Sequence, residues 1–266
     1  MNWLDAAARL TRENAAFVLV TVLETQGSAP RDTAAKMVVA ADATYDSIGG
    51  GRLEFEAAAM ARQLLADGRA AVQTRAFTLG NDLGQCCGGR VTLLLECFPA
   101  CAFHIALFGA GHVGRALAVI LSELPCRVRW HDSRAEIFPP TVAPNIETLA
   151  MKNPFEAVEN CPPAAFYLVM THSHDLDFEL CEAMLNRADA RYCGLIGSRS
   201  KAASFRGRLR KKGFAAAELS RLTCPIGRAS IRGKTPMEVA VSITAELLEL
   251  HHHATAESPQ SPLKTS

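Results

Sequence analysis

The glycine-rich string Gly109–Gly114, which reads GAGHVG, constrains the fold of this chain more than any other feature. An apolar run from His104 to Phe108 precedes it, and a helical pattern follows from Val113. A G-x-G-x-x-G string between a strand and a helix is typical of the turn that receives a cofactor's phosphate in a Rossmann fold. We therefore expect residues 104 to about 196 to form a Rossmann-type α/β unit that binds an anionic cofactor.

Each glycine of this string has its own role in such a turn. Gly109 permits the tight turn, Gly111 lets a phosphate approach the backbone, and Gly114 lets the helix lie close to the sheet. The N-terminus of the helix adds N–H donors and a partial positive charge. His112 either contacts the phosphate or only covers the end of the helix.

Charged residues follow where the next strand is expected to end. Asp132 comes at the end of the predicted strand from Cys126 to His131. An acidic residue at this place accepts a hydroxyl from a ribose or a comparable ring donor. Arg134 would modify that preference, so both residues are candidate cofactor contacts.

The polar string Thr171–Asp177 follows another apolar run. Ligands bind at the carboxyl ends of strands in open α/β sheets. His172, His174 and Asp177 are therefore candidates for polar contacts to the cofactor or for proton transfer. Two alternatives stay open. The histidines and carboxylates could bind a metal, or Asp175 or Asp177 could cap the following helix.

Two further strings are candidate anion contacts. One ends an apolar run and consists of Gly197, Ser198 and Arg199, where Ser198 either caps a helix or helps to bind an anion. The other precedes a helical pattern and consists of three consecutive glycines, Gly49, Gly50 and Gly51. Consecutive glycines are unfavourable in backbone entropy. They indicate a close backbone approach or a second anion contact, with a flexible turn as the alternative.

Adjacent cysteines, Cys86 and Cys87, stand between Gln85 and two glycines. Core packing explains such a pair poorly, whereas thiolates suit soft metals and sulfur exchange. The chain has nine cysteines, an odd number, and no CxxC pair, so a disulfide framework is not expected. We expect Cys193 to be a buried strand residue.

The order of the patterns predicts two domains and a tail. Residues 1–100 mix strands and helices as in an α+β domain with an antiparallel sheet. Residues 101–250 alternate strand and helix, which predicts a Rossmann-like doubly wound parallel sheet. The last helix begins with a capping box formed by Thr235 and Glu238 and runs to about Leu250. The fold class is thus α/β, and we expect residues 251–266 to be a disordered tail.

The charge balance and hydropathy exclude some classes of protein. A net charge of +1 argues against a nucleic-acid binder with a broad positive surface, and the basic run Arg206–Lys212 is interpreted as a solvated helix face. No apolar run approaches the roughly 18 residues that cross a bilayer. Asp5 and Arg9 interrupt any secretory leader. We expect a cytoplasmic protein with no membrane partner and, by default, a homodimer.

Short strings between about residues 15 and 250 follow one another in a specific order: Val20–Leu23, Gly27–Arg31, Ala35–Met37, Ile48–Glu54, Leu83–Gly89, Gly109–Gly114, Met170–His174 with Asp177, Gly194–Arg199, Cys224–Gly227, Gly233–Glu238 and Ala240–Ile243. Each string is weak alone, but the ordered combination resembles the XdhC/CoxI family of xanthine dehydrogenase accessory proteins.

The resemblance implies a protein that binds the molybdenum cofactor (molybdopterin) and is not itself an enzyme. It implies that the chain protects the cofactor, supports its sulfuration by a cysteine desulfurase, and delivers it to the molybdenum-binding subunit of xanthine dehydrogenase. On this basis Cys86 and Cys87 become candidate molybdenum contacts.

Two other functions stay open from the residues alone. An NAD(P)-dependent oxidoreductase would use the Gly109–Gly114 turn and Asp132, but the chain shows no Tyr-x-x-x-Lys pair for hydride transfer. A metal-dependent hydrolase would use His172, His174 and Asp177.

Overall fold

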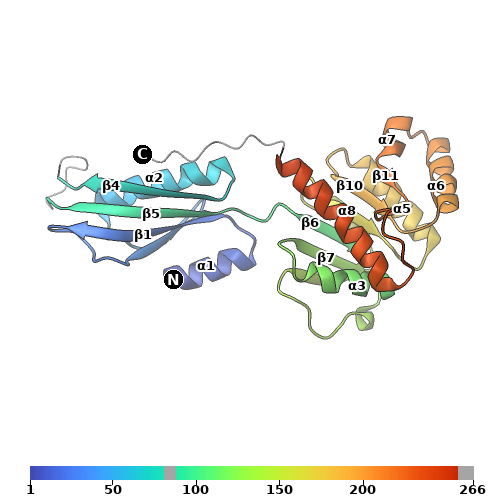
Figure 1. The fold of residues 1–266 in the computed structure, drawn as a ribbon, viewed down its shortest axis with the longest axis horizontal. Coiled ribbons are helices and arrows are strands. Elements are labelled where there is room, and N and C mark those ends of the chain that lie inside the picture. Colours follow the sequence, from blue (N-terminus) through green and yellow to red (C-terminus); the bar gives the residue numbers. More distant parts are fainter. Residues whose placement is uncertain (81–87, 257–266) are drawn as a thin grey trace. The chain divides into compact units, whose positions relative to one another are not determined.

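The computed structural model describes residues 1–80 and 88–256, which fall into two compact units, Met1–Cys101 and the chain from Ala102 onward (Figure 1). Each unit has its own hydrophobic core. No helix in the described part of the chain is both long enough and apolar enough to span a bilayer.

The first unit is built around one antiparallel sheet. Its elements are α1 (Trp3–Arg12), β1 (Phe17–Gln26), β2 (Lys36–Val39), β3 (Thr44–Asp46), α2 (Gly51–Asp67), β4 (Ala71–Thr78) and β5 (Arg90–Phe98). The five strands have the order β3-β2-β1-β5-β4. Leu53, Ala57 and Leu64 recur at helical spacing, so one face of α2 packs against the sheet. This is the antiparallel sheet that the sequence predicts for this part of the chain.

The second unit is built around a parallel sheet. Its elements are β6 (His104–Phe108), α3 (His112–Leu121), β7 (Arg127–Asp132), the 3-10 helix η1 (Ala135–Ile137), β8 (Ile146–Ala150), α4 (Phe155–Glu159), β9 (Phe166–Val169), α5 (His174–Asn186), β10 (Tyr192–Leu195), α6 (Arg199–Lys211), α7 (Ala216–Ser220), β11 (Leu222–Thr223) and α8 (Pro236–Ala256). The six strands have the order β11-β10-β9-β6-β7-β8, and all neighbours are parallel. The predicted doubly wound Rossmann fold is confirmed.

The winding of this sheet reverses between β6 and β9. The chain proceeds outward from β6 to β8 and then returns to β9 on the other side of β6. Crossovers between parallel strands are right-handed, so the helices on the two sides of the reversal cover opposite faces. α3 packs against α8, whereas α5 packs on β9 and β10 (Figure 1). Ligands bind at such a reversal, at the carboxyl ends of the strands.

Some boundaries differ from the sequence predictions. The strand β8 and the helices α4 and α7 were not predicted, because short elements carry few buried residues and their periodicity is weak. The tail prediction is corrected for residues 251–256, because α8 continues to Ala256. There the ring of His251 stacks on buried Phe103, with ring centroids 4.2 Å apart. Residues 257–266 lie outside the described part of the chain.

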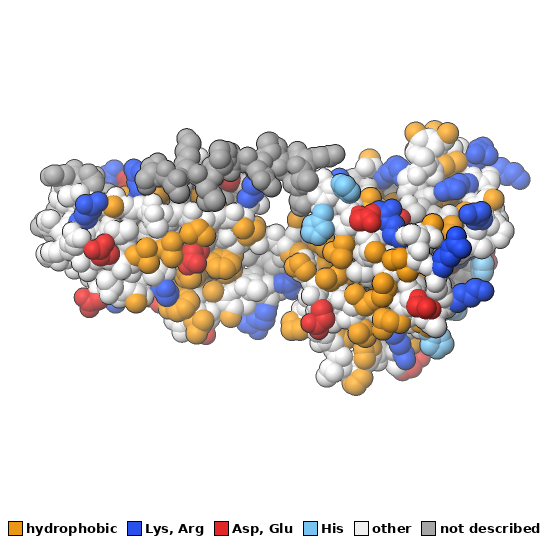
Figure 2. Space-filling view, in the orientation of Figure 1, with side chains coloured by type: hydrophobic (Ala, Val, Ile, Leu, Met, Phe, Trp, Pro, Cys, Tyr) orange, Lys and Arg blue, Asp and Glu red, His pale blue; other side chains and the backbone are white. Residues whose placement is uncertain are grey.

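The basic run Arg206–Lys212 lies on the second half of α6 and just beyond it. Most of its cationic side chains are exposed, and Figure 2 shows Lys and Arg side chains gathered over this part of the second unit. Positive charges in the last turn of a helix also interact favourably with the helix dipole. This exposure agrees with a solvated helix face, and it also leaves open the alternative of a docking patch for an acidic partner.

Candidate functional site

The loops that follow β6 and β9 meet at the reversal of the sheet. Gly109 has a φ of +109°, and a Cβ at this position would stand 2.3 Å from the carbonyl oxygen of Met170. Its N–H donates to the carbonyl of His131 at 2.8 Å. Only glycine combines this backbone angle with so close an approach. The first glycine of the string therefore closes the turn, as the sequence predicts.

The start of α3 lies against this turn. A Cβ at Gly114 would stand 2.2 Å from the carbonyl oxygen of Gly109, so the third glycine is needed for the close packing of the helix. The indole Nε1 of buried Trp130 donates to the same oxygen at 3.0 Å. Trp130 thus holds the turn from the neighbouring strand β7.

The second glycine of the string has a different environment. A Cβ at Gly111 would meet no atom within 4 Å. Gly111 is the N-cap of α3, and no side chain of the described residues accepts a hydrogen bond from this end of the helix. By contrast, Ser173 caps α5 and Ser198 caps α6. The protein itself gives no steric reason for a glycine at position 111, and the N–H groups of α3 stay open to a ligand. His112 is exposed on the first turn.

Asp132 ends β7 and is already engaged by the protein. One of its oxygens accepts from the Ala110 N–H at 2.9 Å, and both accept from the guanidinium of Arg134, at 2.9 and 3.0 Å. Burial by itself raises the pKa of Asp132. The hydrogen bonds from Arg134 and Ala110 outweigh this effect, and the pKa is lowered to about 2. The carboxylate therefore supports the glycine turn, and Arg134 engages both of its oxygens.

Asp177 is buried under the loop after β9. Its Oδ1 accepts from the hydroxyl of Thr171 at 2.7 Å and from the N–H of Thr171 at 3.1 Å. Its Oδ2 pairs with the ammonium of Lys201 at 2.6 Å. Only 1% of the Asp177 side chain is exposed, so the residue fixes the loop and is closed to direct contact with a cofactor.

The two histidines of this loop are exposed. His172 lines a cavity, whereas His174 is the first residue of α5. Ser173, and not an aspartate, caps this helix by accepting from the Leu176 N–H. The described residues contain no group of three His, Cys, Asp or Glu side chains that could hold a metal ion. Asp177, which a metal-dependent hydrolase would use, is instead paired with Lys201.

A cavity of about 320 Å³ opens at the carboxyl ends of β6, β7, β8 and β9. Its lining includes Gly109, Asp132, Thr171 and His172, which all belong to motifs identified in the sequence. It also includes His131 and Lys152, which belong to none of those motifs. His131 was missed because it lies inside a predicted strand and belongs to no motif, and Lys152 was missed because β8 was not predicted. The sequence feature that could have identified His131 is its position directly before Asp132, a candidate cofactor contact.

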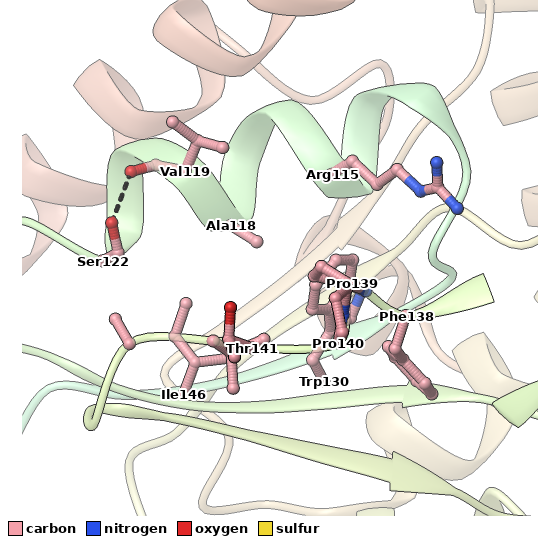
Figure 3. Close-up of a pocket in the computed structure, with 12 residues that line it drawn as sticks. Arg115, Ala118, Val119, Ser122, Trp130, Phe138, Pro139, Pro140, Thr141 and Ile146 are labelled. Carbon is pink, nitrogen blue, oxygen red and sulfur yellow. Dashed lines mark hydrogen bonds between the residues drawn. The ribbon is translucent and has the colours of Figure 1, made fainter. Parts of the chain in front are cut away.

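A larger cavity of about 520 Å³ lies on the opposite face of β7. It separates α3 from the segment that joins β7 to β8, and Figure 3 shows Ala118 pointing from α3 toward Pro139 and Pro140. Trp130 lines this cavity, whereas its neighbour His131 lines the smaller one, because successive strand residues face opposite sides. The walls are mainly apolar, and no unpartnered buried polar atom lines it among the residues that the structure describes.

The remaining predicted residues lie outside the smaller cavity. Ser198 caps α6 by accepting from the Lys201 N–H, and Gly197 and Arg199 flank it at the end of β10. In the first unit, Glu54 accepts from the N–H groups of Ile48 and Gly50. The chain's own carboxylate thus fills the helix entrance formed by the consecutive glycines Gly49, Gly50 and Gly51.

The sequence analysis makes predictions about three cysteines, Cys86, Cys87 and Cys193. Cys86 and Cys87, the candidate molybdenum contacts, lie outside the described residues. Cys193 is buried in β10, as predicted, and burial raises the pKa of its thiol to about 11. A thiol with a raised pKa is a poor nucleophile and a poor metal ligand at neutral pH.

Comparison with known families matches both units. Residues 105–247 match the XdhC Rossmann domain, and residues 10–76 match the XdhC and CoxI family. The chain belongs to the XdhC and CoxI family. The resemblance drawn from the ordered strings is therefore confirmed.

The chain is also similar to one curated protein in sequence and to one solved structure in fold. YqeB of Escherichia coli K12, described as uncharacterized, is 31% identical over 266 residues, which cover 96% of this chain and 47% of YqeB. The chain thus spans about half the length of this curated relative. A crystal structure from Bacillus halodurans, described as a xanthine dehydrogenase, has a TM-score of 0.51 and 18% identity and covers 97% of this chain and 98% of its own. At that identity the likeness shows the fold alone.

Proposed function

We propose that the protein binds the molybdenum cofactor at the carboxyl ends of β6 and β9 and acts as an accessory protein of xanthine dehydrogenase. Membership of the XdhC and CoxI family supports the accessory role. The observation that carries the binding site concerns the described part of the chain, where no side chain caps the start of α3 and the adjacent cavity is lined by a buried histidine without a partner.

The residues present fit a phosphorylated ring cofactor. Gly111 leaves open space in front of the first turn of α3, where backbone N–H groups and the helix dipole favour a phosphate. Lys152 and His172 line the adjacent cavity and add a positive charge and a polar group. When bound, the cofactor supplies the molybdenum centre for the client enzyme. The chain's own residues bind it, orient it and limit its exposure to water.

A nicotinamide dinucleotide fits this site less well. In dinucleotide-binding Rossmann folds, the acidic residue after the second strand accepts hydrogen bonds from a ribose. Here both oxygens of Asp132 already accept from Arg134, and one also accepts from Ala110. The ribose acceptor is therefore occupied, which favours the molybdenum cofactor over NAD(P).

The test is retention of cofactor through gel filtration under anaerobic conditions, with bound molybdenum and pterin assayed and NAD as a parallel ligand. We expect near-stoichiometric pterin on the wild type and most of it lost in Gly111→Ala, because the added Cβ stands where the phosphate approaches. Gly207→Ala is the matched control, since a Cβ there also meets nothing within 4 Å but lies on α6. Tight NAD with no pterin would overturn the proposal.

Sulfuration and delivery form the second part of the proposal. We infer that Cys86 or Cys87 approaches the molybdenum, that a cysteine desulfurase supplies the sulfur, and that the molybdenum-binding subunit of xanthine dehydrogenase receives the product. Cys86→Ser or Cys87→Ser should weaken retention of sulfurated cofactor, whereas Cys101→Ser should not. Unchanged retention in both of the first two variants would remove the cysteines from the proposal.

A further inference from the structure

His131 is the least satisfied polar side chain of the candidate site. It is 3% exposed, and its ring stacks on Phe108 with ring centroids 4.9 Å apart and an interplanar angle of 19°. Neither Nδ1 nor Nε2 has a hydrogen-bond partner among the described residues. Buried polar atoms almost always have a partner, because leaving one unpaired is unfavourable. The ring nitrogens of His131 therefore need a hydrogen-bonding group that the described residues do not provide.

The surroundings of His131 indicate the kind of group. The apolar part of the cavity lining is formed by Phe108, Met151, Pro154, Phe155, Leu176 and Leu180. The polar part is formed by His131, Asp132, Ser133, Lys152, Thr171, His172 and Ser173. Its volume of about 320 Å³ lies at the lower end of the range for small-ligand pockets. Apolar side chains beside polar groups suit a flat ring that presents a polar edge to one of those groups, and His131 is the buried one that lacks a described partner.

We infer that this cavity is a ring subsite, in which the flat, nitrogen-containing ring system of a phosphorylated cofactor lies with its polar edge against His131 while the phosphate binds at the start of α3. This inference rests on the proposed function and assigns the two ends of the ligand. Gly109 belongs to both the turn before α3 and the lining of the cavity, so the two subsites are continuous.

The charge state of His131 agrees with this assignment. Burial, with a smaller effect of Arg129, lowers the pKa of His131 to about 4. The imidazole is therefore neutral near neutral pH, with one N–H donor and one acceptor nitrogen. A neutral ring gives a phosphate no ionic attraction. It does match the edge of a pterin, which carries amide-like donors and acceptors.

The experiment separates the two ends of the ligand on the full chain. 6-Hydroxymethylpterin, followed by its fluorescence, probes the ring subsite, and inorganic phosphate, followed by calorimetry, probes the start of α3. His131→Phe keeps an aromatic ring on Phe108 and removes both nitrogens. We expect it to weaken pterin binding about tenfold, as for a lost buried hydrogen bond. Phosphate binding should not change.

Two further measurements guard against a variant that only perturbs the fold. Tyr167→Phe is the matched control, because it removes a buried hydroxyl that donates to the Val158 carbonyl and lines no part of the cavity. It should leave pterin binding unchanged. In the wild type, the ring nitrogen NMR signals of His131 should shift when the pterin is added.

Equal pterin affinity in wild type and His131→Phe, or unchanged His131 signals in the pterin complex, would overturn the ring subsite. If the protein retains molybdenum cofactor but does not bind 6-hydroxymethylpterin, the ring subsite fails and the proposed function stands. If it retains neither compound, the proposed function fails as well.

Discussion

At the scale of single residues, partners decide which polar groups of the site are free to act. Asp132 and Asp177 are the conspicuous acids of the sequence motifs, yet Arg134 and Lys201 engage them. His131 belongs to no motif, but both of its ring nitrogens lack a partner among the residues described. His131 is thus the buried side chain of the cavity whose polar atoms lack a described partner, and no sequence motif marks it.

The burial of His131 makes a prediction about pH. The folded protein protonates this ring only near pH 4, whereas the unfolded chain does so near 6.5. The unfolded state therefore binds more protons between these values, and stability falls as pH falls through this window. The loss amounts to roughly 3 kcal/mol. The His131→Phe variant should not show this loss of stability, as measured by urea unfolding from neutral pH to about pH 4. Parallel stability curves for the two proteins would contradict the prediction.

At the scale of elements, side chains from neighbouring strands and helices hold the loops of the site. Trp130 on β7 holds the turn after β6, and Lys201 on α6 holds the loop before α5 through Asp177. Thr171 completes the second link through its hydroxyl and N–H groups. The two loops that meet at Gly109 are therefore fixed before any ligand binds, which reduces the entropy lost on binding.

The buried pair of Asp177 and Lys201 should have a large effect on stability. Asp177→Asn leaves the ammonium of Lys201 without its ionic partner, and breaking a buried pair costs about 3–5 kcal/mol. Asp177→Asn combined with Lys201→Met should recover part of this loss. The exposed pair of Arg129 and Glu147 serves as the control, because Glu147→Gln should cost less than about 1 kcal/mol. Equal losses at both sites in urea unfolding would refute the assignment.

The indole of Trp130 should matter through its hydrogen bond to Gly109. Trp130→Phe keeps most of the buried ring but removes the Nε1–H donor, which should destabilise the second unit by about 1–3 kcal/mol. It should also weaken cofactor retention, because the turn before α3 loses its support. The chain has two tryptophans, so Trp3→Phe in α1 is the matched control. Comparable losses of cofactor in both variants would speak against this role.

At the scale of the whole molecule, the chain consists of two units with separate cores. The proposed cofactor site described above belongs to the second unit alone, whereas the cysteine pair of the proposal belongs to the range of the first. Binding of the phosphate and ring should therefore depend on the second unit, and sulfur chemistry on the first.

A fragment of residues 102–256 tests this division, because it contains the parallel sheet and its whole core. We expect it to unfold cooperatively in urea and to bind 6-hydroxymethylpterin as the full chain does. Asp177→Asn should destabilise the fragment as much as it destabilises the second unit in the full chain. A fragment without a cooperative transition would show that the second unit needs the first in order to fold.

Several features of the fold could be predicted from the sequence because they depend on local backbone requirements. The turn at Gly109 needs a positive φ, and the cap at Thr235 needs a hydroxyl beside Glu238, which accepts from the Thr235 N–H and hydroxyl. Alternating strands and helices then predict the parallel sheet. Short elements such as β8 were not predicted, because few of their residues are buried.

The sequence by itself determined the Rossmann fold and the family, since these follow from strings of adjacent residues. Only the tertiary structure decided which groups are available. Glu54 fills the glycine-rich entrance of α2, Lys201 neutralises Asp177, and His131 has no described partner inside a cavity. The physical reason is that the hydrogen-bond partners and the burial of a side chain come from strands and loops that are distant in the sequence, and folding alone brings them together.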